Sequence, residues 1–260
     1  MQKIIFTDLD GTLLDHDTYS YDKAKPALNI VKKKNVPLIF CTSKTKAELD
    51  EYKKKLRIKD PIISENGGGI FIPKGYFDFG FRYDAQDKDY YIIKLGTDYR
   101  KLTSVINRIS RKYSIVPLNK ITAAQFARDS GLTVRQARLA LKRNFDEGFR
   151  VLDKREEKAI LKEIRRSNLN YTIGGRYHHI IGRNDKGRAV KILTKLFRKK
   201  YGKIKTIGLG DSQNDFKMLD NVDIPFIVMK KNGKYSTRKY KKAKGVGPAG
   251  WNKAVKEVLL

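Results

Sequence analysis

The sequence predicts an α/β fold, with a Rossmann-like parallel-sheet core that carries helices on both faces and is interrupted by an inserted α+β domain. Three observations predict it: short apolar runs alternate with helical patterns from the N-terminus, the alternation is lost near residue 85, and it returns near Gly182. Strands that alternate with helices are typical of a parallel sheet. We therefore expect the core in residues 1–84 and 176–260 and the insertion in residues 85–175.

The first part of the core is predicted from its apolar spacing. The run at residues 3–7 predicts a buried strand, and apolar residues at helical spacing in residues 21–34 predict a helix. Further strands are expected at 36–41 and 61–64, a helix at 44–56, and a strand that pairs back as a hairpin at 70–72.

The pattern changes inside the insertion. Strand-like residues 90–93 precede a helical pattern at 99–113 and a charged helical stretch that reaches Phe145. This mixture predicts an α+β arrangement. The parallel pattern then returns, with helices expected at 186–201 and 216–219 and strands at 206–210 and 224–228.

Length and composition limit the class of protein. With 260 residues and a 40% share of hydrophobic residues, the chain can form one large domain or a core with an insertion. No stretch approaches the ~18 apolar residues of a membrane span and no signal peptide is evident, so we expect a cytoplasmic protein. The single cysteine, Cys41, excludes internal disulfides and lies in an apolar run, where a buried thiol is expected.

The charge is strongly unbalanced. The chain carries 57 Lys plus Arg against 28 Asp plus Glu, a formal net charge of +29. The positive residues are spread along the chain, and runs such as 32–34 and 53–55 are typical of solvated helix faces. We expect attraction of small anionic substrates and non-specific nucleic-acid adhesion at low salt, but no specific nucleic-acid partner.

A carboxylate pair follows the first predicted strand. Because side chains alternate along an extended backbone, Asp8 and Asp10 project to the same side while Leu9 points toward the core. Two carboxylates that close imply a bound cation or a shared proton. Gly11 lets the chain turn sharply. A simple polar turn is the alternative interpretation of this segment taken alone.

Polar residues also follow other predicted strands. Thr42 and Ser43 can hold a phosphoryl oxygen or cap the next helix. Lys186 opens a helix, where it would neutralise a phosphate or be one more solvated lysine. Asp211 would complete a Mg²⁺ site with the first carboxylate of the opening pair, and Asp215, one helical turn later, would act from the second coordination sphere.

In this order the four clusters resemble the haloacid dehalogenase-like phosphatase superfamily. The matching motifs are Asp8-Leu9-Asp10-Gly11-Thr12, Thr42, Lys186 and residues 210–215. The resemblance implies a phosphatase in which Asp8 attacks phosphorus to form an aspartyl-phosphate and Asp10 protonates the leaving alcohol and then activates water.

The same resemblance implies the remaining roles. Thr42 and Lys186 would hold the phosphoryl oxygens. Mg²⁺ would bind the Asp8 carboxylate, the backbone carbonyl of Asp10 and Asp211, with Asp215 nearby.

The insertion lies between the second and third motifs, as in the subclass with a large α+β cap that selects the substrate. Within it the chain resembles the mannosyl-3-phosphoglycerate phosphatase family, at residues 15–19, 42–45, 65–68, 145–147, 174–176, His179 and 214–216. The implied substrate is a small anionic sugar phosphate with a carboxylate, and the implied product is the compatible solute mannosylglycerate. The implied substrate-binding residues are Ser43, Lys44, Glu65, Asn66, Gly67, Gly68, Arg176 and His179, with Arg176 available for the carboxylate.

Two details of the cap stay open. The sequence has Gly148 where the family pattern leads us to expect proline, and a different sugar phosphatase would use the same catalytic residues. His178 and His179 are adjacent on a predicted strand and face opposite sides, so at most one lines the site.

A second class of function is suggested by residues 121–140, which read as two short helices around a glycine turn. The second helix is basic, which is typical of DNA-binding helix-turn-helix motifs. Its basic residues are Arg135, Arg138, Lys142 and Arg143. The apolar residues Ala137, Leu139 and Leu141 favour instead a helix that packs within the cap.

Overall fold

The computed structural model describes residues 1–173 and 177–260. Its larger sheet contains β1 (Gln2–Thr7), β2 (Leu38–Cys41), β3 (Ile62–Ser64), β4 (Gly69–Pro73), β5 (Ala85–Gln86), β6 (Tyr90–Lys94), β11 (Ile204–Gly210), β12 (Ile224–Met229) and β13 (Lys241–Val246). The strand order is β13-β12-β11-β1-β2-β3-β4-β6-β5. The pairs from β13 to β3 are parallel, whereas β4, β6 and β5 pair antiparallel. The expected hairpin of β3 with β4 is confirmed.

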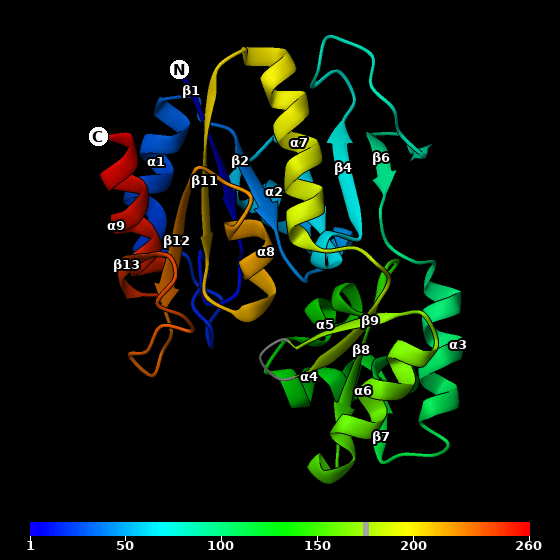
Figure 1. Cartoon of the computed structure of the whole chain (residues 1–260). Helices are drawn as coiled ribbons and strands as arrows, with labels where there is room; N and C mark the ends of the chain where they lie inside the picture. Colours follow the sequence, from blue (N-terminus) through cyan, green and yellow to red (C-terminus); the bar gives the residue numbers. More distant parts are fainter. Residues whose placement is uncertain (174–176) are drawn as a thin grey trace.

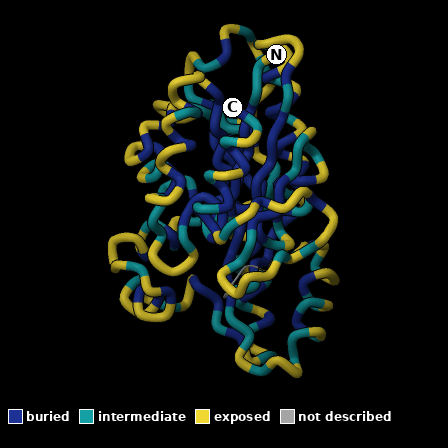
Figure 2. Tube along the Cα trace, turned by 90° about the vertical axis from the view of Figure 1, so that its left-hand side faces the viewer, coloured by how far each residue is buried: buried dark blue, intermediate teal, exposed yellow. Residues whose placement is uncertain are grey.

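Helices cover both faces of this sheet, as the fold prediction requires (Figure 1). One face packs against α1 (Lys25–Lys33), α2 (Lys46–Leu56) and α9 (Pro248–Leu259), and the other against α7 (Lys186–Tyr201) and α8 (Phe216–Leu219). The alternation along β1 explains the two layers, because Ile5 packs on the first face and Ile4 and Phe6 on the second. Figure 2 shows the buried trace concentrated in the middle of the molecule, with exposed residues on the outer loops and helices.

A second, smaller sheet lies below the first in Figure 1. It contains β7 (Ile115–Pro117), β8 (Asp146–Val151), β9 (Asn170–Ile173) and β10 (His178–Ile181), in the antiparallel order β7-β8-β10-β9. Its helices are α3 (Tyr99–Ile109), α4 (Ala123–Ser130), α5 (Val134–Ala140) and α6 (Glu157–Arg166). Leu102, Ile106, Ile160 and Ile164 from α3 and α6 form a core with Phe149 and Ile180 of the sheet. We call this unit the cap.

The sheet pairing differs from the predicted boundaries at both ends of the insertion. Strands β5 and β6 belong to the larger sheet, because β6 pairs with β4 over five residue pairs from Gly69 with Lys94 to Pro73 with Tyr90. Strand β10 belongs to the smaller sheet, because it pairs with β8 and β9. The partner of a short strand is chosen by tertiary packing, which the predicted boundaries at residues 85 and 175 could not take into account.

The helix pair at residues 121–140 is present, and Gly131 ends α4 in the left-handed conformation with φ of 74°. The second helix packs against the core: Thr45 Oγ1 at the start of α2 donates a 2.9 Å hydrogen bond to the carbonyl of Leu139, and Arg135 pairs with Glu51 at 2.7 Å. These contacts favour the interpretation of α4 and α5 as part of the cap.

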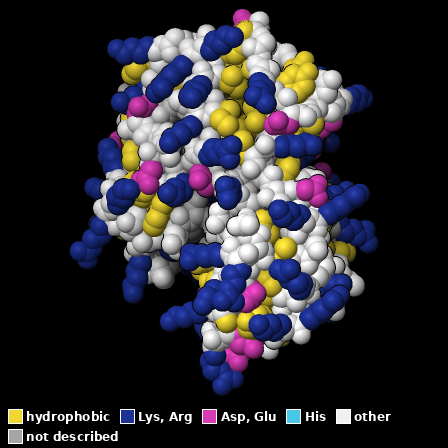
Figure 3. Space-filling view, turned by 45° about the vertical axis from the view of Figure 1, so that its right-hand side comes forward, with side chains coloured by type: hydrophobic (Ala, Val, Ile, Leu, Met, Phe, Trp, Pro, Cys, Tyr) yellow, Lys and Arg dark blue, Asp and Glu magenta, His cyan; other side chains and the backbone are white. Residues whose placement is uncertain are grey.

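Charge and burial elsewhere agree with the sequence. On the face drawn in Figure 3, Lys and Arg side chains are spread over the whole surface, with few acidic groups between them. Cys41 is a buried free thiol. Among the described residues, no helix combines the length and the apolar character that crossing a membrane requires.

Candidate active site

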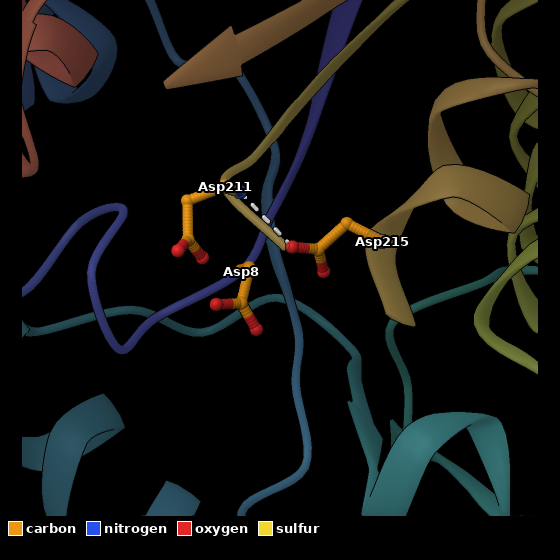
Figure 4. Close-up of side chains that lie close together, drawn as sticks. All are labelled: Asp8, Asp211 and Asp215. Carbon is orange, nitrogen blue, oxygen red and sulfur yellow. Dashed lines mark hydrogen bonds between the residues drawn. The ribbon is translucent and has the colours of Figure 1, made fainter. Parts of the chain in front are cut away.

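Three buried aspartates converge at the carboxyl ends of β1 and β11 (Figure 4). Asp8 follows β1 and Asp211 follows β11, and these two strands are neighbours in the sheet, so their ends meet. Asp215 comes from the helical turn that follows. Each side chain offers an oxygen within 4.8 Å of the others. Gly11, with φ of 74°, turns the chain past this cluster, and a Cβ there would lie 3.2 Å from Asp211 Oδ2.

Lys186 balances part of this negative charge. Its side chain is almost fully buried, and Nζ lies 2.7 Å from Asp8 Oδ1 and 2.6 Å from Asp215 Oδ1. Although burial lowers the pKa of Lys186, the charges of Asp215 and Asp8 more than offset that effect and raise it. The ammonium is therefore charged, and the alternative interpretation of Lys186 as a solvated surface lysine is wrong.

Asp215 is fully engaged with its neighbours. While Oδ1 accepts from Lys186, Oδ2 accepts hydrogen bonds from the backbone N–H groups of Asp211 and Ser212, both at 3.0 Å. These bonds orient the loop that carries Asp211. The supporting role of Asp215 at a metal site stays a prediction.

The cluster retains an excess of negative charge. Burial raises the pKa of Asp8 well above its ordinary value, and the charges of Asp215 and Asp211 raise it further against the effect of Lys186. Burial and the charge of Asp215 raise the pKa of Asp211 to about 6. The three carboxylates offer hard oxygen ligands, and their negative charge exceeds the positive charge of the one ammonium. The set therefore fits a divalent cation such as Mg²⁺.

The carboxylate of Asp10 lies outside the three-aspartate cluster. Its Oδ2 is 2.9 Å from Nζ of Lys44, so its charge is balanced by a lysine and not shared directly with Asp8. Asp8 and Asp10 nevertheless line the same cavity of about 420 Å³, together with Ser43 and Asp211. The two side chains thus face one shared space, as the alternation along the strand predicts.

The hydroxyl pair after β2 does not cap the next helix. Thr45 is the N-cap of α2: its Oγ1 accepts from the backbone N–H of Glu48 at 3.2 Å, and the Glu48 carboxylate accepts from the N–H of Thr45 at 2.9 Å. The capping interpretation of Thr42 and Ser43 is therefore wrong. Ser43 lines the same cavity as Asp10, whereas Thr42 is fully buried and does not line it.

A second cavity, of about 150 Å³, lies between core and cap and shares Asp10, His16 and Ser43 with the first. The cap lines it with apolar side chains and with Arg143 and His179. Its full lining is Asp10, His16, Tyr19, Ser43, Lys44, Glu48, Leu118, Phe126, Ser130, Leu132, Ala140, Arg143, Tyr177 and His179. The predicted residues Ser43, Lys44 and His179 are here, whereas His16, Tyr19, Arg143 and Tyr177 were not assigned. Residues 15–19 belong to a motif of the resemblance, which was the available signal for the first two.

Asp146 organises the polar side of this cavity. Its Oδ1 accepts from Arg143 Nη1 and lies against Nδ1 of His179, both at 2.7 Å, and its Oδ2 accepts from Asn66 Nδ2 at 2.8 Å. Although burial raises the pKa of Asp146, His179 and Arg143 lower it below its ordinary value. His178 turns the other way, to Glu157 at 3.0 Å, which confirms that only one of the two histidines lines the cavity.

The predicted substrate-binding segment Glu65, Asn66, Gly67 and Gly68 lines neither of these two cavities. Glu65 Oε2 instead accepts from the backbone N–H groups of Asn144 and Phe145 in the cap, at 2.8 and 2.7 Å. The segment therefore joins core to cap. Glu65, Asn66 and Gly67 all have positive φ (48°, 56° and 85°), so the side chains of Glu65 and Asn66 point where an extended strand would not place them. Arg176 lies outside the described residues.

Glu65 makes stability depend on pH. Burial raises its pKa from about 4.5 to about 7, although Arg143 opposes the shift. Between these two pKa values the folded state keeps a proton that the unfolded chain loses. The contribution of Glu65 to the free energy of unfolding is therefore fully present below pH 4.5 and is lost as the pH rises through 7. The loss is on the order of 3 kcal/mol. In Glu65→Gln we expect urea unfolding between pH 4.5 and 8 to give a flatter profile.

A matched control for this prediction is Glu257→Gln, because Glu257 is exposed and pairs with Lys241 on the surface. Its unfolding profile should follow that of the parent protein. Equal slopes for Glu65→Gln and the parent would contradict a raised pKa at Glu65.

Comparison with known proteins defines the class. A profile of the haloacid dehalogenase-like hydrolase family matches residues 5–243. The chain therefore belongs to this family, and it is a phosphatase, a phosphoric monoester hydrolase. The fold agrees: a solved structure from Thermoplasma acidophilum superposes with a TM-score of 0.72 over 100% of both chains at 21% identity. A sugar phosphatase of subclass IIB of the superfamily superposes with a TM-score of 0.65 at 17% identity, covering 99% of this chain and 98% of its own.

Curated relatives are similar over the whole length. A glucosyl-3-phosphoglycerate/mannosyl-3-phosphoglycerate phosphatase from Methanococcoides burtonii is 47% identical, covering 100% of this chain and 98% of the relative. A relative of the same name from Persephonella marina is 42% identical, covering 98% of this chain and 97% of the relative. A mannosyl-3-phosphoglycerate phosphatase from Pyrococcus horikoshii is 34% identical over 95% and 96%.

Proposed function

We propose that the protein is a Mg²⁺-dependent phosphatase that hydrolyses mannosyl-3-phosphoglycerate to mannosylglycerate and phosphate. The observation that carries the chemistry is that Asp8 and Asp211 line one cavity together with Asp10, while Asp8 pairs with the buried ammonium of Lys186. The names of the full-length relatives support the substrate.

In the proposed reaction a carboxylate oxygen of Asp8 attacks phosphorus while the bond from phosphorus to the leaving oxygen breaks. Asp10 gives its proton to that oxygen, and then takes a proton from the water that attacks the aspartyl-phosphate. Phosphate leaves and the Asp8 carboxylate is regenerated. Lys186 would counter the charge on the phosphoryl oxygens, and the hydroxyls of Thr42 and Ser43 would bind them.

Asp8 and Asp211, with the backbone carbonyl of Asp10, would hold the Mg²⁺. When bound, the ion supplies positive charge against the phosphoryl oxygens and balances the excess negative charge of the aspartate cluster. Asp215 would orient the loop of Asp211 through its Oδ2, while its Oδ1 keeps the ion pair with Lys186.

The cavity under the cap suits the rest of the substrate. Arg143, Lys44 and His179 can meet the carboxylate and hydroxyls of a glycosylated glycerate, and Phe126 and Tyr177 offer apolar surface for a sugar ring. A cytoplasmic location is part of the same proposal, since the chain's one cysteine, Cys41, is buried and its fold uses no internal disulfide.

Phosphate release is the test. With Mg²⁺ present we expect the protein to prefer mannosyl-3-phosphoglycerate and glucosyl-3-phosphoglycerate over simple hexose phosphates, and a chelator should reduce turnover to background. Preference for hexose phosphates would keep the reaction and remove the proposed substrate. No turnover of any phosphomonoester would contradict the proposal as a whole.

A further inference from the structure

Asn66 connects the core to the cap through its side-chain amide. It follows β3 in the core and is only 3% exposed. Its Oδ1 accepts a 3.2 Å hydrogen bond from Nδ2 of Asn214, which lines the same cavity as Asp8. Its Nδ2 donates a 2.8 Å hydrogen bond to Oδ2 of Asp146 in the cap. An ionised carboxylate only accepts hydrogen bonds, so the NH₂ end of the amide is the end that faces Asp146.

The backbone explains why asparagine suits this position. Asn66 has φ of 56°, a left-handed conformation that asparagine adopts more readily than most residues. The core holds its backbone, since its N–H donates to the carbonyl of Thr42 at 2.9 Å and its carbonyl accepts from Nδ2 of Asn184 at 3.3 Å. The core therefore presents the amide to the cap from a fixed point.

Asp146, the partner in the cap, is fully buried and directs two other side chains. Its Oδ1 accepts from Arg143 Nη1 and faces Nδ1 of His179, so Oδ2 is the oxygen that meets the core. Arg143 and His179 line the cavity of about 150 Å³ under the cap, whereas Asn66 and Asp146 do not. A displacement of Asp146 would therefore move both cavity-lining groups together.

We propose that Asn66 is a positioning residue, which acts through Asp146 to fix these two cavity-lining side chains relative to the catalytic core. Arg143 and His179 then meet the carboxylate and the sugar of a substrate whose phosphate lies at Asp8. This inference rests on the proposed function. A phosphomonoester that lacks a sugar and a carboxylate needs the catalytic core but not this contact.

The alternative role for Asn66 is direct binding of substrate, which the resemblance implies. Both polar groups of its amide have protein partners, so a substrate would have to replace one of them. The two roles differ in what repairs a defect. Another pair of side chains that restores the contact between core and cap repairs a loss of positioning, but it does not replace a lost substrate contact.

The experiment exchanges donor and acceptor across this contact. Asn66→Asp keeps an acceptor for Asn214 but turns a second carboxylate toward Asp146, and the two groups repel each other. We expect kcat/KM for mannosyl-3-phosphoglycerate to fall about 30-fold, mainly through KM, which is the scale of one or two hydrogen bonds to a charged group. For 4-nitrophenyl phosphate it should stay within about 3-fold of the parent.

The double variant Asn66→Asp with Asp146→Asn restores one donor and one acceptor, in the reverse order. Its kcat/KM for mannosyl-3-phosphoglycerate should exceed that of either single variant by about 10-fold, because the two substitutions act on one contact.

Further variants make the comparison specific. Asn66→Gly removes the amide without adding a charge, and glycine tolerates the same φ, so it gives the same test if Asn66→Asp fails to fold. It should also lose more activity on the sugar phosphate than on 4-nitrophenyl phosphate. Asn168 has the same φ of 56° and is exposed in the cap, so Asn168→Asp and Asn168→Gly should match the parent for both substrates.

The ¹⁵N signals of the imidazoles test the positioning without any substrate. The chain has three histidines. The signal of His179 should shift in Asn66→Asp and return toward the parent's position in the double variant. His178 is the internal control, because it faces Glu157 on the other side of β10.

Equal losses for both substrates would overturn the inference, as would a double variant no more active than the single ones or a His179 signal that does not respond. Failure of the proposed function looks different. The parent itself would then release no phosphate from mannosyl-3-phosphoglycerate, while the imidazole signals would still report the contact.

Discussion

Replacing Asp8 with asparagine is expected to reduce kcat for phosphate release by about 10⁴-fold or more, the scale on which removal of a covalent nucleophile acts. Asparagine has nearly the shape of aspartate, but its amide does not attack phosphorus to form the acyl-phosphate. The measurement is phosphate release with Mg²⁺ present, from the proposed substrate and from 4-nitrophenyl phosphate. Both should be lost, since the nucleophile is needed whatever the leaving group.

The control for this variant is Asp220→Asn. Asp220 is an exposed aspartate that pairs with Lys239 and lies on no wall of the two cavities. Its activity should equal that of the parent. Substantial activity in Asp8→Asn would show that phosphoryl transfer does not pass through this carboxylate.

Replacing Lys186 with methionine is expected to affect both activity and stability. The buried ammonium is paired with Asp8 and Asp215, so its loss leaves two carboxylates facing each other without a cation. Breaking a buried ion pair from one side costs about 3–5 kcal/mol of unfolding free energy. The loss of charge opposite the phosphoryl oxygens should lower kcat by about 10³-fold.

Urea unfolding in the presence of a chelator measures the stability effect without a bound cation, and phosphate release with Mg²⁺ measures the activity. Lys191→Met is the matched control, because Lys191 is an exposed residue of the same helix α7. If Lys186→Met unfolded like this control, the ammonium would not be balancing the aspartate cluster. If only stability fell, its role at the phosphoryl group would be ruled out.

The arrangement of the catalytic core could be predicted from the sequence because it depends on local pattern and simple topology. Apolar runs specify β1 and β11, and alternation places Asp8 and Asp211 at their carboxyl ends. In a parallel sheet those ends meet at one edge, so residues about 200 positions apart in the chain come together without any knowledge of side-chain packing.

The cap could be predicted only in outline. Which sheet the short strands β6 and β10 join depends on the partners that tertiary packing offers, and the boundaries at residues 85 and 175 shifted for that reason. The capping role expected of Thr42 or Ser43 belongs to Thr45, since the start of α2 was two residues later than its sequence pattern suggested.

What the sequence by itself determined is the family, the parallel core and the acidic and basic groups at its strand ends, because each follows from residue order along one or two elements. What only the tertiary structure decided is how those groups pair: Lys44 with Asp10, Glu65 with the cap backbone, and Asp146 with Arg143 and His179. Such pairings depend on the direction of side chains, on left-handed backbone conformations and on burial between elements that are distant in the sequence. A local sequence pattern therefore does not predict them.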